Sequence, residues 1–98
     1  MPNLYGNFSA KTVTETSMNV PANAWIALPA TTANGRMLVE VFNKGETRLY
    51  LSFDNTVGVK ARSAIGTGEF KMFPIQDNVI LYARSHSGGT RAIITEYK

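Results

Sequence analysis

The 98 residues suffice for one domain, because domains commonly contain roughly 100–150 residues. The net charge of +3 comes from scattered basic residues, whereas nucleic-acid-binding proteins usually concentrate such charge on one face or arm. The absence of cysteine excludes disulfides, thiolate metal sites and a cysteine nucleophile. We expect neither a signal peptide nor a membrane span, since the longest apolar run, 37–42, has the length of a strand and contains a glutamate.

The first eight residues differ from the rest of the chain. They hold Leu4, Tyr5 and Phe8 among Asn, Gly and Pro, and eight residues are too few to bury these groups in a core of their own. Soluble proteins tend to reserve exposed apolar groups for contacts. The pattern predicts an extended N-terminal arm, 1–8, with these three residues as candidate protein contacts, and one domain over 9–98. The alternative is an arm that folds back and caps its own domain.

Beyond the arm, helical patterning is almost absent. Short runs rich in β-branched and aromatic residues recur instead, separated by Gly, Asn, Pro and Asp. These runs predict strands at about 9–17, 24–28, 36–43, 48–53, 57–64, 69–73, 79–85 and 90–97. The first run is Thr-rich and polar enough for an edge strand or an assembly strand. The pattern indicates an all-β protein: a single Ig-like or jelly-roll β-sandwich of about eight short antiparallel strands.

Alternation within the strands indicates which side chains form the core. The predicted core consists of Trp25, Met37, Val39, Val41, Leu49, Leu51, Phe53, Leu81, Ile93 and the aliphatic neighbours of Thr95. The segments at 43–46 and 85–89 predict hairpin loops. In the first of them, Gly45 is expected to take the positive φ that a tight hairpin needs.

The residues that could carry chemistry do not form a recognisable catalytic pattern. The only histidine, His86, lies in a Ser/Gly-rich loop with Ser85 and Ser87 beside it, while Asp54 and Asp77 are distant in sequence. Most carboxylates fall in predicted turns or at strand ends, where turn formation and solvation are their usual roles. The sequence therefore predicts a non-enzymatic protein with no catalytic, metal-binding or cofactor-binding residues and no cofactor.

Five aromatic residues allow stacking on bases or sugars: Trp25, Tyr50, Phe53, Tyr82 and Tyr97. For several of them the strand pattern favours core packing instead. Single-strand nucleic-acid binding would require clustered Lys and Arg between them, and the clusters are missing.

Three segments, 39–54, 66–69 and 81–97, together resemble small virion proteins of tailed bacteriophages. The resemblance covers about 37–97, through an Asn-containing turn before an aliphatic-Tyr strand, a Phe-Asp pair, a Gly-Glu turn and a Ser-Gly-Gly loop. It departs from the family at 66–69, where a frequent proline is missing, and 1–20 is unmatched. The resemblance implies an Ig-like or jelly-roll sandwich on the head surface, the neck or the tail, and it brings no catalytic residues.

The expected function is that of a phage virion structural protein, such as a capsid decoration or a collar or neck component. The chain would bind capsid, portal or adaptor proteins, associate with itself and stabilise the particle, without contact to a membrane or nucleic acid. It would be made in the host cytoplasm and reside in the virion. The alternative is a carbohydrate- or receptor-binding module of a tail fibre, and a third possibility is a small OB-like nucleic-acid binder.

Overall fold

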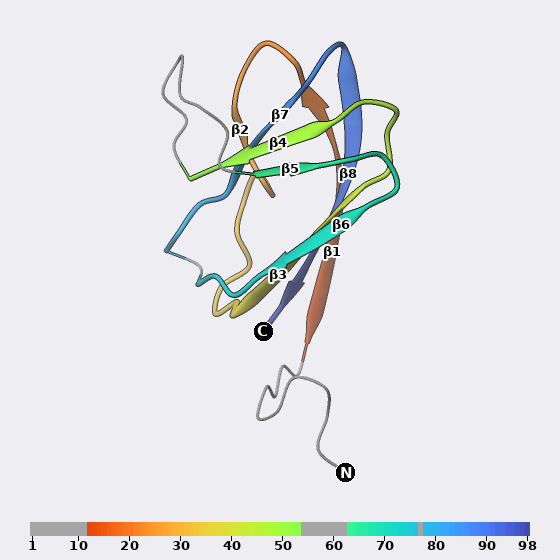
Figure 1. Cartoon of the computed structure of the whole chain (residues 1–98). Helices are drawn as coiled ribbons and strands as arrows, with labels where there is room; N and C mark the ends of the chain where they lie inside the picture. Colours follow the sequence, from red (N-terminus) through yellow and green to blue (C-terminus); the bar gives the residue numbers. More distant parts are fainter. Residues whose placement is uncertain (1–11, 54–62, 77) are drawn as a thin grey trace.

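The computed structural model describes residues 12–53, 63–76 and 78–98, and the regular elements in these ranges are eight β-strands (Figure 1). No helix in the described part of the chain is long and apolar enough to cross a membrane. The expected all-β fold is confirmed, and every strand overlaps a predicted run. The strands are β1 (Val13–Pro21), β2 (Ile26–Ala27), β3 (Leu38–Asn43), β4 (Leu49–Ser52), β5 (Ser63–Ile65), β6 (Phe70–Phe73), β7 (Tyr82–Ser85) and β8 (Gly89–Tyr97).

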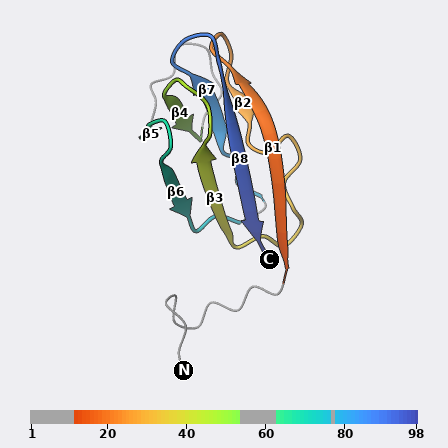
Figure 2. The same ribbon diagram turned by 90° about the vertical axis from the view of Figure 1, so that its right-hand side faces the viewer.

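The strands form two antiparallel four-stranded sheets. The first sheet has the order β1-β8-β3-β6, and Figure 2 shows these four strands side by side. The second sheet has the order β2-β7-β4-β5. The pairs are nested: β1 with β8, β2 with β7, β3 with β6 and β4 with β5. This is one long double ribbon rolled into a sandwich, so the fold is a jelly roll rather than an Ig-like sandwich.

The two predicted hairpin loops are wrong, because they connect strands of different sheets. Residues 43–46 lead from β3 in the first sheet to β4 in the second, and 85–89 lead from β7 to β8. Gly45 also lacks the expected positive φ. A Cβ atom at this position would lie 2.6 Å from the backbone nitrogen of Arg91 and closer still to the Thr90 hydroxyl. Glycine is therefore required here by the close approach of β8.

The core lies between the sheets and is aliphatic. Its fully or nearly fully buried residues are Val20, Leu28, Val39, Val41, Leu49, Leu51, Ile65, Ile75, Leu81, Ala83, Ala92 and Ile94, against which Met18, Ile26 and Phe73 pack. The prediction is confirmed for Val39, Val41, Leu49, Leu51 and Leu81. Each buried aliphatic side chain removed from water contributes about 1.5–3 kcal/mol to folding.

Four predicted core residues lie elsewhere. Met37 and Phe53, which flank β3 and β4, are 38% and 49% exposed. Trp25 is half-buried, and Ile93 points outward because its neighbours Ala92 and Ile94 occupy the inner face of β8. Both faces of β8 carry an isoleucine, so alternation alone does not indicate which face is inside. Pairing of Ile94 opposite the buried Val41 decides it.

A buried ion pair between Arg36 and Glu96 holds the β2–β3 and β6–β7 connections against β8. The Arg36 Nη1 atom lies 3.0 Å from Glu96 Oε2, and their side chains are 0% and 1% exposed. Glu96 Oε2 also accepts a hydrogen bond from the Ala33 backbone nitrogen at 2.8 Å. Arg36 donates further hydrogen bonds to the carbonyls of Gln76 and Val79. The expectation of solvated carboxylates is thus wrong for Glu96.

The buried side chain of Asn43 links the two sheets by hydrogen bonds at the connection between β3 and β4. Its amide nitrogen donates to the Thr47 carbonyl and, at 3.0 Å, to the Ile65 carbonyl at the end of β5. Its oxygen accepts hydrogen bonds from the Gly45 nitrogen and the Thr90 hydroxyl. All the hydrogen-bonding capacity of this buried amide is therefore used, as a buried polar group requires.

Candidate interaction surfaces

The first sheet has an apolar outer face. Successive residues of a strand point to opposite faces, so the residues between the buried ones of β1, β3, β6 and β8 point outward. The register places Ile93, Phe42 and Phe70 in one row across three strands. A second row contains Val13, Tyr97 and Leu38. We define the outer apolar face as Val13, Leu38, Phe42, Phe70, Met72, Ile93 and Tyr97.

Two residues of the outer apolar face are largely uncovered. Val13 is 59% exposed and Phe70 is 57% exposed, and the other members are half-buried. A third row, Glu15, Thr95, Glu40 and Met72, lies between the two apolar rows. Glu40 accepts a hydrogen bond from the Tyr97 hydroxyl at 3.4 Å. Exposed apolar side chains arranged in rows of this kind are typical of an interaction site.

β1 lies at the edge of the first sheet, as predicted for the Thr-rich run. Among the described strands it pairs only with β8. Just before β1, the backbone nitrogen and oxygen of Thr12 both bond to Lys98. The predicted contact residues Leu4, Tyr5 and Phe8 lie outside the described residues, as does the domain boundary at residue 9, and both remain predictions.

The second sheet carries aromatic side chains around an arginine on its outer face. Arg84 of β7 pairs in register with Tyr50 of β4, and its guanidinium carbon lies 5.8 Å from the Tyr50 ring centroid and 5.3 Å from that of Trp25. The Tyr50 hydroxyl lies 2.8 Å from Nδ1 of His86. The prediction of core packing is therefore wrong for Trp25, whereas Tyr50 lies on the face opposite Leu49 and Leu51, as the alternation in its strand indicates. The sequence signal for this surface is the alternation of Tyr50 and Arg84 with Leu51 and Ala83, which point inward.

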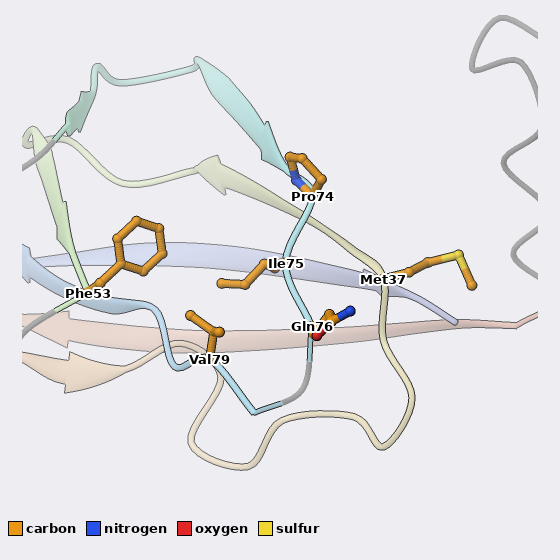
Figure 3. A pocket seen from close by; sticks show the side chains of 6 residues that line it. All are labelled: Met37, Phe53, Pro74, Ile75, Gln76 and Val79. Carbon is orange, nitrogen blue, oxygen red and sulfur yellow. The ribbon is translucent and has the colours of Figure 1, made fainter.

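An apolar hollow of ≈ 500 Å³ lies beside the connection between β6 and β7 (Figure 3). Its walls are Met37, Phe53, Pro74, Ile75, Gln76 and Val79. In Figure 3 the side chains of Phe53, Ile75 and Val79 point toward one another, whereas that of Met37 points away. The described lining includes no titratable side chain, so the hollow supplies apolar contact area and no acid or base.

The groups around His86 do not form a triad within the described residues. Its Nδ1 faces Tyr50, and the neighbouring Ser85 is buried and donates to the Ser87 carbonyl at 3.2 Å. Asp54 and Asp77 lie outside the described part of the chain. Among the residues that the structure describes, His, Asp and Glu form no group of three that could hold a metal ion.

Comparisons with known proteins add little to this description. No protein-family model matches the chain, and no curated protein matches it. One solved structure with a similar course of the chain comes from work titled "Bacillus endospore appendages form a novel family of disulfide-linked pili". The two chains are 14% identical, with a TM-score of 0.43, and the alignment covers 92% of this chain and 91% of the other. The resemblance to phage virion proteins therefore stays a prediction.

Proposed function

We propose that this protein is a structural component of a tailed-phage particle, which binds capsid or head–tail proteins and further copies of itself. The observation that carries the proposal is the outer apolar face of the first sheet. Phe70 and Val13 remain more than half exposed on this face, and its row Ile93-Phe42-Phe70 is apolar across three adjacent strands. Contact with a neighbouring protein would remove this surface from water.

Two further features support the proposal. The jelly roll is a common architecture of viral capsid and lectin domains, which is an argument from analogy of fold. The edge strand β1 is nine residues long, and an unpaired edge can extend a sheet across a subunit boundary. The resemblance over 37–97 suggests that the neighbours are virion proteins, and hence a location in the virion after synthesis in the host cytoplasm.

The test is incorporation into particles. Phe70→Asp places a charge in the row Ile93-Phe42-Phe70, and loss of the phenylalanine contact with the neighbouring protein should weaken binding about ten- to a hundredfold. We expect the wild-type chain in gradient-purified particles by quantitative mass spectrometry and the variant to be strongly depleted. The matched control is Asn23→Asp, which adds the same charge at an exposed residue of the β1–β2 connection. Absence of the wild-type chain, or equal occupancy of Phe70→Asp, would refute the proposal.

The second candidate function is a carbohydrate- or receptor-binding module of a tail fibre. It is favoured by one observation, the cluster of Trp25, Tyr50 and Arg84 on the outer face of the second sheet. This cluster lies on the opposite side of the sandwich from the outer apolar face, so one molecule can use both surfaces.

A further inference from the structure

Arg84 is the cation at the centre of the aromatic cluster on the second sheet. Its Nε atom is shielded from solvent and has no hydrogen-bond partner. Within the described residues the arginine also forms no ion pair, and β2, β4, β5 and β7 contain neither Asp nor Glu. A buried N–H group without a hydrogen-bond partner is costly, so the unsatisfied Nε calls for an explanation. The Nε atom itself is shielded, but Arg84 as a whole is only half-buried, so an external anion would balance the charge of the guanidinium.

The surroundings of Arg84 restrict the form of that anion. The rings of Trp25 and Tyr50 lie within 6 Å of the guanidinium, close enough for cation–π attraction that orients it. Both rings are half-buried and so keep part of their apolar surface in water. Beside them, the Tyr50 hydroxyl and the exposed His86 form a hydrogen-bonded pair with the rings edge to face. The site thus offers a cation, apolar ring surface and polar hydrogen-bonding groups together.

We propose that this surface binds an acidic sugar, a pyranose ring that carries a carboxylate. Arginine matches a carboxylate with two parallel hydrogen bonds. The C–H face of a sugar ring packs against aromatic rings, and its hydroxyls pair with Tyr50 and His86. A bare phosphate would use the guanidinium and leave the rings unused. The proposal specifies the ligand of the second candidate function and does not depend on assembly through the first sheet.

Binding to defined sugars tests the proposal. The probes are tetragalacturonate, glucuronate and N-acetylneuraminate, each titrated into the full chain and followed by NMR chemical-shift changes and calorimetry. The methyl ester of tetragalacturonate keeps the rings and removes the charge. We expect binding of at least one acid, and at least tenfold weaker binding of its ester.

Three variants locate the site. Arg84→Met and Trp25→Leu should each weaken binding of the acid at least tenfold, whereas Arg91→Met, which removes the same charge from the first sheet, should leave it unchanged. Arg84→Lys keeps the charge without the two-pronged geometry and provides a second measurement if Arg84→Met fails to fold. We expect it to bind less tightly than wild type.

The proposal is wrong if the folded wild-type chain binds none of the three acids or binds the ester equally well. It is also wrong if Arg84→Met binds like wild type, or if a Glu-rich peptide or single-stranded DNA binds more tightly than every sugar acid. Particle incorporation of Arg84→Met should remain normal, which separates failure at this site from failure of the assembly proposal.

Discussion

Removing the carboxylate of Glu96 should strongly destabilise the domain. In Glu96→Ala, Arg36 keeps its hydrogen bonds to the Gln76 and Val79 carbonyls and loses its only counter-charge among the described residues. Because both side chains are almost wholly buried, the expected cost is about 3–5 kcal/mol, the usual range for a broken buried pair. A domain of this size has a stability of only about 5–15 kcal/mol.

Urea denaturation followed by circular dichroism measures this cost. A loss of this size should lower the urea midpoint by more than about 1 M and the melting temperature by more than about 10 °C. Glu15→Ala is the matched control, because Glu15 is an exposed carboxylate of the first sheet and should change stability by less than about 0.5 kcal/mol.

The double variant Arg36→Met with Glu96→Leu separates charge from packing. It leaves no buried charge, so it should cost less than Glu96→Ala alone. The reasoning is refuted if Glu96→Ala costs under about 1 kcal/mol, or if the double variant costs as much as the two single changes added together.

Two further changes test the packing of the β3–β4 connection against β8 and the role of the N-terminal arm. Gly45→Ala should lower the free energy of unfolding, measured by urea denaturation, by about 1–3 kcal/mol, because its Cβ would collide with β8. The control is Gly89→Ala, whose Cβ would have its nearest neighbour 3.6 Å away, at the Val20 carbonyl. Equal urea midpoints for the two variants would contradict the explanation. Deletion of 1–8 should leave the melting temperature unchanged and reduce incorporation into particles. Normal occupancy, or a loss of several degrees, would instead favour the capping role of the arm.

Part of the interaction surfaces could be predicted from sequence. Alternation along β4 and β7 sets Tyr50 and Arg84 opposite the buried Leu51 and Ala83, so their shared face follows once those strands are placed. Their adjacency depends on the β4–β7 pairing, which the sequence did not indicate. Trp25 lies before the two-residue strand β2, whose position depends on β7. The cation–aromatic cluster is therefore a product of tertiary structure.

The fold class and the approximate positions of the strands follow from the sequence, because alternation and turn residues act locally. Strand pairing depends on the packing of the two sheets, since the residues at 43–46 and 85–89 suit both a hairpin and a connection between sheets. The same packing turns Ile94 rather than Ile93 inward, because both faces of β8 are apolar. It also brings together Arg36 and Glu96, which are 60 residues apart, since no local pattern records a partner at that separation.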